Sequence, residues 1–312
     1  MSGGVDSSVA ALLLSRQGYE VHGVTLQVWE HENEEVAASK RWEERGCCKV
    51  GLARYVAQQL NITHEVVDAR AQFRTAVIDD FVAAYASGTT PNPCVRCNER
   101  VKIRQLIDLA DTKGISFVAT GHYAQVDRIH ERPILLKGAD ARKDQSYFLY
   151  RLQESWLHRL LFPVGGMQKP DVWVEAKSLG LHEDEMRESQ EICFVSHGDY
   201  RTFLQEQPNL PATPGRFIDE TGATLGTHEG IPFYTPGQRR GLGIATGQRL
   251  YVQRVQPDTN TVVLGPEEHL LQSSCTIKDL NILDPRILTD STQVGCKVRY
   301  ATPPAQATTT PL

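Results

Sequence analysis

The stretch SGGVDSS, residues 2–8, decides the fold of this 312-residue chain. Its two glycines let backbone amides approach an anion closely, and hydroxyls and an acid follow where a helix opens. Such a nest, with a helix dipole behind it, can hold pyrophosphate. The spacing is not GxxxxGK[ST] and lacks that motif's lysine, which disfavours transfer of a γ-phosphate. We therefore expect a nucleotide site built by Ser2, Gly3, Gly4, Val5, Asp6, Ser7 and Ser8.

Beyond this loop, the first half of the chain alternates strand-like and helix-like segments, which predicts a parallel sheet with crossover helices. We expect helices over 7–17, 52–60, 71–86 and 98–114, and strands over 20–28, 62–67 and 115–120. The charged segment 30–46 reads as a connection. Open α/β sheets bind ligands just beyond the carboxyl ends of their strands. The GHYA stretch that follows residue 120 therefore lies where a ligand is expected.

The second half of the chain has a different pattern of predicted secondary structure. Residues 146–186 read as helical, and from about residue 198 short strands alternate with Pro and Gly turns, as in small β domains. We expect the final ATPPAQATTTPL to be an unstructured tail of a domain that stops short. The predicted domains are 1–145, a helical segment 146–197, a central β domain 198–270 and the start of another, 271–312.

Composition restricts where and how the chain can act. The net charge is −5, so a nucleic-acid site has to be a local patch rather than an overall basic surface. The sequence has no run of about 20 apolar residues and no signal peptide, so we expect a cytoplasmic protein without a membrane partner. Its seven cysteines are an odd number, which in a cytosolic setting favours catalytic or metal-binding sulfur over structural disulfides.

Three of these cysteines draw attention. Cys94 and Cys97 form a CxxC between turn formers and a helix, and Cys193 stands alone in SQEICFV. They are candidates for three ligands of a [4Fe-4S] cluster with one open iron, or for thiol chemistry without metal. A structural zinc site is disfavoured because the sequence has no second CxxC. We assign no chemistry to the adjacent pair Cys47 and Cys48.

Several further stretches accompany the loop in a fixed order along the chain. They are TTPNPCVRCNERVKI, ATGHYA, KDQSYFL, FPVG, SQEICFVSHGDY and GQRRGLGI. With SGGVDSS, they resemble the tRNA-specific 2-thiouridylase family over nearly the whole chain. The loop itself resembles those of enzymes that split ATP into AMP and pyrophosphate to activate a carbonyl oxygen. The resemblance implies an α/β fold, with a parallel-sheet ATP pyrophosphatase domain (adenine nucleotide alpha hydrolase-like), then a helical segment and small β domains.

The resemblance also implies a reaction and its participants. ATP with Mg²⁺ would adenylate the C2 oxygen of the wobble uridine in a tRNA, and a cysteine persulfide would replace that oxygen with sulfur. In this family the persulfide carrier corresponds to Cys193, and Cys97 would release the sulfur by forming a disulfide with it. The sulfur would come from a persulfide donor, such as a cysteine desulfurase or a sulfur carrier protein.

Binding residues follow by the same resemblance. Leu26 would contact adenine, and Gly121 would lie near ATP. The residues expected to contact the target base or the tRNA are Asn92, Pro93, Cys94, His122, Lys143, Asp144, Gln145, Arg299 and Tyr300.

The sequence also departs from the family pattern. Many family members have Asp where Cys94 stands, and a strand precedes the loop where this chain has only Met1. Two rival functions stay open. An amidating ligase of the ATP-pyrophosphatase type explains SGGVDSS but not the cysteines. An inactive tRNA-binding fragment would lack the first strand and the last domain.

Overall fold

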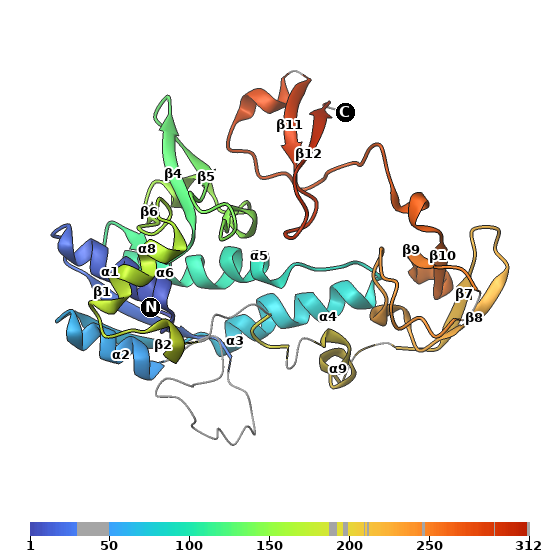
Figure 1. The fold of residues 1–312 in the computed structure, drawn as a ribbon, viewed down its shortest axis with the longest axis horizontal. Coiled ribbons are helices and arrows are strands. Elements are labelled where there is room, and N and C mark those ends of the chain that lie inside the picture. The colour runs from blue at the N-terminus through green and yellow to red at the C-terminus, as the bar shows by residue number, and fades with distance from the viewer. Residues whose placement is uncertain are drawn as a thin grey trace. The chain divides into compact units, whose positions relative to one another are not determined.

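The computed structural model describes residues 1–29, 50–186, 192–195, 199–208, 210, 212–244, 247–289 and 291–310. The chain folds into two compact units (Figure 1). The first unit contains Met1–Phe73, Cys94–Phe194 and Leu280–Leu312, and the second contains Arg74–Pro93 and Val195–Asp279. The predicted connection 30–46 and the pair Cys47 and Cys48 lie outside the described residues. The domain boundaries drawn from the sequence stay predictions.

The first unit opens with alternating helices and strands. These elements are α1 (Val5–Arg16), β1 (His22–Gln27), α2 (Val50–Gln59), β2 (Thr63–Asp68) and α3 (Arg70–Phe73). Strands β1 and β2 pair in parallel, from His22 opposite Thr63 to Gln27 opposite Asp68. A second parallel pair joins β3 (Val118–Ala119) to β6 (Leu160–Leu161). This parallel pairing with intervening helices confirms the predicted α/β class.

Met1 lies beside β1 and is hydrogen-bonded to it. Its amino group donates to the Val24 carbonyl, and its own carbonyl accepts from the Thr25 hydroxyl at 2.6 Å. The start of the phosphate loop is thereby fixed to the same strand that carries Leu26.

Two helical stretches, one in each unit, each contain a π-type turn. In the second unit the π turn Arg74–Ile78 leads into α4 (Asp79–Ala86). Helix α5 (Pro93–Cys97), which lies in the first unit from Cys94 on, continues through the π turn Asn98–Lys102 into α6 (Ile103–Lys113). The helix predicted to begin near residue 98 therefore starts at Pro93, whose missing N–H is not needed in a first helical turn. Gly114 ends α6 with φ +66°.

The remaining part of the first unit differs from the sequence prediction in two places. Residues 146–186 are not simply helical, since β6 lies between α7 (Glu154–Leu157) and α8 (Lys169–Lys177). A short apolar run such as Leu160–Leu161 does not distinguish strand from helix by periodicity. The predicted unstructured tail is also wrong, because β12 (Ala305–Thr309) pairs antiparallel with β11 (Thr292–Cys296). Threonines favour such a ladder, and the partner strand lies outside the tail itself.

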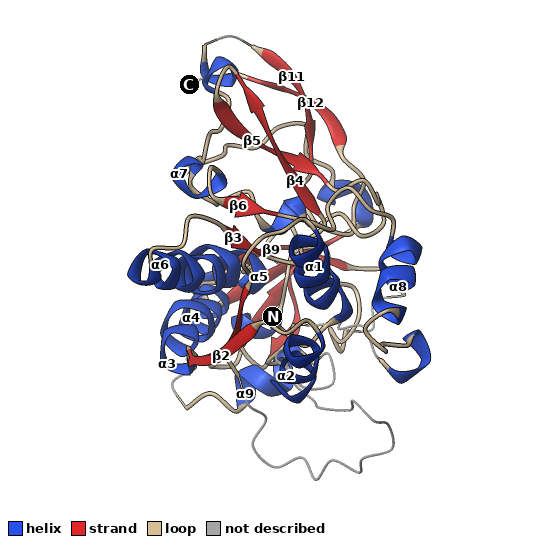
Figure 2. Ribbon diagram, turned by 90° about the vertical axis from the view of Figure 1, so that its left-hand side faces the viewer, coloured by secondary structure: helices blue, strands red, loops and turns tan. Residues whose placement is uncertain are grey.

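A hairpin of β4 (Ala124–Ile129) and β5 (Arg132–Lys137) was not predicted. Its turn residues His130 and Glu131 have φ of +48° and +64°, a conformation usually signalled by Asn-Gly or Asp-Gly. Figure 2 shows this pair and the β11–β12 pair, and both belong to the first unit. Short 3-10 turns complete this unit at Ser146–Phe148, Glu183–Glu185 and Pro285–Leu288.

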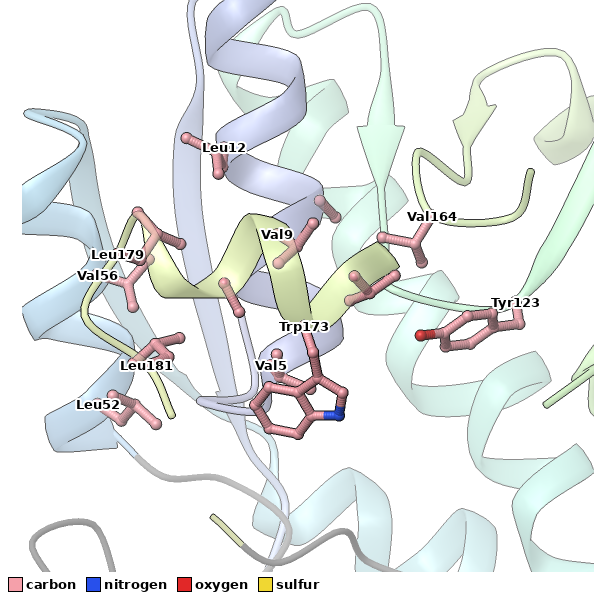
Figure 3. Packing of buried hydrophobic residues seen from close by; sticks show 13 residues of the cluster. Val5, Val9, Leu12, Leu52, Val56, Tyr123, Val164, Trp173, Leu179 and Leu181 are labelled. Atoms are coloured by element: carbon pink, nitrogen blue, oxygen red, sulfur yellow. The ribbon is translucent and has the colours of Figure 1, made fainter. Parts of the chain in front are cut away.

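The core that fixes the phosphate loop lies between α1, α2 and α8. Val5 and Val9 of α1 pack in one cluster with Leu52 of α2 and Trp173 of α8 (Figure 3). Full burial of an aliphatic side chain contributes about 1.5–3 kcal/mol. Because Val5 belongs both to the loop and to this core, the position of the loop follows from packing that does not involve a ligand.

The second unit is a small β domain with helices. Its sheet has the order β8 (Thr224–His228), β7 (Gly215–Ile218), β10 (Thr261–Gly265), β9 (Tyr251–Gln256). Only the β7–β10 pair in it is parallel. Besides α4, it contains α9 (Tyr200–Gln205) and 3-10 turns at Ile231–Phe233, Pro257–Thr259 and Glu267–Leu270. Phe217 and the strand β10 are fully buried, which gives this unit a core of its own.

Candidate active site

The phosphate loop turns directly into α1, which begins at Val5, two residues before the predicted start. Gly3 adopts φ +73°, the left-handed region that glycine reaches without strain. The hydroxyls of Ser7 and Ser8 both donate to the Gly4 carbonyl at 3.0 Å. No side chain caps the helix, so an anion in the loop can accept from the amides of its first turn.

Gly121 lies against this loop. A Cβ atom at position 121 would be 2.5 Å from the Ser7 nitrogen and 2.6 Å from the Asp6 carbonyl carbon. Real Cβ atoms do not approach backbone this closely, so only glycine fits. The structure therefore brings together the loop and the predicted ATP residue Gly121, which are more than a hundred positions apart in the chain.

The Asp6 carboxylate is held from two sides. Its Oδ1 accepts from the Lys169 ammonium at 2.6 Å and from the Tyr123 hydroxyl at 2.8 Å. The Lys169 side chain is only 10% exposed, and its ammonium lies 5.6 Å from the centre of the Tyr123 ring and 5.5 Å from that of Trp173. Sequence reasoning missed Lys169. The only signal was a lysine next to Pro170 at a helix start, which by itself indicates nothing about a site.

The three candidate cysteines lie in the first unit. Cys94 and Cys97 are on α5, and Cys193 is in the short described segment 192–195. All three are thiols; Cys97 is buried, and the other two are partly buried. Next to Cys193, Phe194 packs edge-on against Phe73 with ring centres 5.7 Å apart, which anchors the segment.

The pKa of the Cys94 thiol depends on neighbouring groups, one of which is Cys193. Burial raises the pKa of the Cys94 thiol, the charge of Lys102 opposes this, and Cys193 raises the pKa further. The structure thus places Cys193 near Cys94, although 193 − 94 = 99 positions separate them in the chain. A raised pKa means that Cys94 is mostly protonated at neutral pH, unlike the aspartate that many family members have there.

His122 lies beside the same lysine. Burial lowers the pKa of His122 to about 3, and the charge of Lys102 contributes to the shift. Its Nδ1 lies 2.6 Å from the Thr120 hydroxyl. The ring is therefore neutral at physiological pH, and it can form hydrogen bonds with a base but does not act as a strong proton acceptor.

The described residues contain no preformed site for a metal ion. Among the described residues, no group of three or more His, Cys, Asp or Glu side chains is placed to hold a metal ion. The cysteines Cys94, Cys97 and Cys193 are all described and form no such group, so a cluster held by these three thiolates stays a prediction from the sequence, and we derive no step through one.

The two predicted tRNA-contacting segments converge. Burial raises the pKa of Tyr300, Asp144 raises it further, and Lys143 opposes the shift. The Tyr300 ring lies 4.5 Å from that of Phe148, centre to centre, and the Lys297 ammonium lies 5.1 Å above it. Tyr300 is 41% exposed, so an aromatic face with a cation above it is presented beside residues 143–145. Arg299, next in the chain, is exposed.

Two residues of the 143–145 segment have structural partners. Asp144 is buried, and its carboxylate accepts from the Gly138 amide at 3.0 Å and from the Ser146 amide and hydroxyl. Gln145 accepts from the Tyr123 amide at 3.0 Å through its side-chain oxygen. Because Tyr123 also donates to Asp6, a continuous set of hydrogen bonds runs from the phosphate loop to this segment.

The remaining predicted residues take the following positions. Leu26 lies near the carboxyl end of β1 and is 9% exposed. Asn92 and Pro93 end the second unit's first segment, immediately before Cys94. Their roles toward adenine and the target base stay predictions. Among the described residues, no helix is long and apolar enough to span a bilayer.

Comparison with known proteins divides the chain near residue 200. The family described as tRNA methyl transferase HUP domain matches residues 1–197, and the one described as tRNA methyl transferase PRC-barrel domain matches residues 201–266. A solved structure described as a predicted subunit of tRNA methyltransferase from Methanocaldococcus jannaschii covers 57% of the chain and 73% of its own, with a TM-score of 0.34 and 20% identity. A likeness this weak supports no conclusion.

Curated relatives match the chain throughout. The tRNA-specific 2-thiouridylase MnmA of Magnetococcus marinus is 45% identical over 100% of this chain and 87% of its own length. The proteins of the same name from Clostridium perfringens and Heliobacterium modesticaldum are 42% and 44% identical, again over 100% of this chain and over 86% and 81% of their own. The chain belongs to the tRNA-specific 2-thiouridylase family.

Proposed function

We propose that this chain is a tRNA-uridine 2-sulfurtransferase, which uses ATP with Mg²⁺ to replace the C2 oxygen of a wobble uridine with sulfur. The family membership supports this activity. One structural observation supports its mechanism. Gly121 lies against the phosphate loop, and the charge of Lys102 lowers the pKa of both the next residue, His122, and Cys94. Two neighbouring residues thereby connect the nucleotide loop with the cysteines.

In the first step the uridine C2 oxygen attacks the α-phosphorus of ATP. The oxygen–phosphorus bond forms, N3 loses its proton to water, and pyrophosphate leaves with the bonding electrons. The amides at the start of α1 suit the phosphates, because a helix N-terminus stabilises negative charge. The low pKa of His122 makes its ring a weak base, and the raised pKa of Cys94 keeps its thiol protonated, so neither residue takes the N3 proton and their roles are hydrogen bonding and positioning.

In the second step a persulfide on Cys193 attacks C2, and AMP leaves. The uridine is then joined to Cys193 through two sulfur atoms. The Cys97 thiol attacks the Cys193 sulfur, which forms a Cys97–Cys193 disulfide and leaves the outer sulfur on C2 as 2-thiouridine. The two thiols are oxidised and the transferred sulfur is reduced, so each turnover needs a thiol reductant and a fresh persulfide donor. Such a cycle fits the reducing cytoplasm.

The two matching families are described as tRNA methyl transferase domains, so methyl transfer is the rival reaction. Methylation of a base by a sulfonium donor needs neither a pyrophosphate loop nor paired thiols. The loop and the thiols of this chain therefore favour thiolation.

Nucleoside mass spectrometry tests the proposal. Wobble uridines are analysed from cells that lack their own enzyme and carry this chain or a vector alone. We expect 2-thiouridine with the chain and none with the vector. Absence of 2-thiouridine would disprove the activity, and a methylated uridine would replace it with methyl transfer. Iron and acid-labile sulfide, measured on anaerobically purified protein, separate the two sulfur routes: a cluster-free enzyme that turns over with persulfide excludes the cluster.

A further inference from the structure

The phosphate loop has no positive charge of its own. From Ser2 to Ser15 the chain contains no Lys or Arg. In the GxxxxGK[ST] loop, a lysine within the motif reaches the β- and γ-phosphates. A loop that binds the same triphosphate without this lysine has to obtain a cation from elsewhere in the fold, unless Mg²⁺ neutralises all of the charge.

Lys169 occupies the position that such a cation needs. It comes from α8, more than 160 residues away, and its ammonium lies 2.6 Å from the carboxylate of the loop residue Asp6. Its backbone nitrogen donates to the buried Asp140 at 3.1 Å, which fixes the root of the side chain. The Tyr123 and Trp173 rings flank the ammonium. The charged end of the lysine is thus directed to the loop from a rigid support.

A purely structural role explains this pair poorly. Lysine is rarely buried, and desolvation of both partners of an ion pair offsets most of their attraction, so apolar side chains of similar volume stabilise a fold equally well. The Lys169 side chain is 10% exposed and that of Asp6 is 32% exposed. A ligand in the loop can therefore reach the Asp6 carboxylate, and the ammonium lies 2.6 Å from that carboxylate.

We propose that Lys169 binds the pyrophosphate part of ATP, exchanging its contact with Asp6 for a phosphate oxygen when the nucleotide enters with Mg²⁺. Asp6 is thereby released to face the metal ion, since Mg²⁺ in nucleotide sites is held by carboxylates together with phosphate oxygens. As the bond between the α-phosphorus and its bridging oxygen breaks, Lys169 stabilises the negative charge that grows on the leaving pyrophosphate. This inference rests on the proposed function, because it assigns Lys169 to the activation step of that reaction.

Calorimetry on the full chain tests it with two probes, inorganic pyrophosphate and AMP. Lys169→Met is expected to weaken pyrophosphate binding by about tenfold or more and to leave AMP binding within about twofold. The matched control is Lys177→Met, at the exposed end of the same helix, which should change neither. Lys169→Arg keeps the charge and should restore part of the pyrophosphate affinity. Equal loss for both probes, or no loss for pyrophosphate, would overturn the assignment.

The single variant Asp6→Asn covers the case in which Lys169→Met fails to fold. Without Mg²⁺, Asp6→Asn should tighten pyrophosphate binding, because the ammonium no longer has a competing carboxylate. An affinity equal to or below that of the wild type refutes the proposal. These measurements involve no tRNA and no sulfur. Wild-type protein that binds pyrophosphate through Lys169 but forms no 2-thiouridine would disprove the thiolation and not this site.

Discussion

Gly121 and Ser7 are so close that a Cβ atom on the former would lie 2.5 Å from the backbone nitrogen of the latter. We therefore expect Gly121→Ala to displace the first turn of α1 and to lower ATP affinity and AMP formation by about tenfold or more. Equilibrium binding of ATP and release of AMP measure the two effects. The control is Gly166→Ala, where the nearest atom to a Cβ is the Gln125 side chain at 3.9 Å. Equal activity of the two variants would contradict the contact.

Replacing either of the two cysteines assigned to sulfur transfer should stop thiolation without stopping the activation step. Cys193→Ser and Cys97→Ser are expected to form no 2-thiouridine, while AMP formation in the presence of tRNA continues. The measurement compares AMP with 2-thiouridine in the same reaction. Cys275→Ser, at an exposed cysteine, should keep both products. Full thiolation by either of the first two variants shows that the assignment is wrong.

Cys94 should react slowly as a nucleophile. Because burial and the neighbouring Cys193 raise the pKa of its thiol, little thiolate is present at neutral pH, and the fraction grows as pH rises. Alkylation by iodoacetamide, followed by peptide mass spectrometry, should modify the exposed Cys275 first at pH 7. Cys94→Asp should retain thiolation, since it restores the residue of many relatives. Rapid labelling of Cys94 at pH 7 would contradict its protonated state.

His122 should make stability depend on pH. Its pKa is about 3 in the folded chain against 6.5 ordinarily, so the unfolded chain takes up the proton first as pH falls. The contribution of the neutral His122 to the free energy of unfolding is fully present above pH 6.5. It is lost as pH falls from there to about 3, at up to about 1.4 kcal/mol per pH unit. Urea unfolding at several pH values should show a shallower dependence for His122→Asn. Other histidines are common to both proteins, and identical slopes would mean that His122 does not carry the effect.

Tyr300 should contribute to tRNA binding. Its partly exposed ring is tilted against Phe148 with Lys297 above, and it offers a face on which an unpaired base stacks. Base–aromatic stacking is worth about 1–3 kcal/mol, so Tyr300→Ala should weaken tRNA binding by roughly tenfold. Filter binding measures it, with Tyr150→Ala as a control at another exposed tyrosine. Equal affinities of the two variants would remove Tyr300 from the interface.

The sequence predicted the elements whose signals are local. The glycines and the helix around Val5 sufficed for the loop, and parallel strands followed from buried apolar runs separated by helices. The hairpin at His130 and Glu131 was missed because its residues lack the usual turn signature. Strand β12 was missed because it pairs with β11, which lies outside the tail, and the tail alone carries no strand pattern.

The same distinction applies to the site. Loop, cysteines and Gly121 were predicted from motifs and family resemblance. Lys169 was not, because its position depends on how α8 packs on α1, which no local pattern records. The link of Lys102 to both Cys94 and His122 likewise appears only once the chain is folded.

The division of the chain also determines where the sulfur atoms lie along the backbone. Cys94 is the first residue after the backbone passes from the second unit into the first, and Cys193 is the second-last before it passes back. Each thiol is therefore within two residues of a crossing point, so both sulfur-bearing segments are covalently continuous with the β unit.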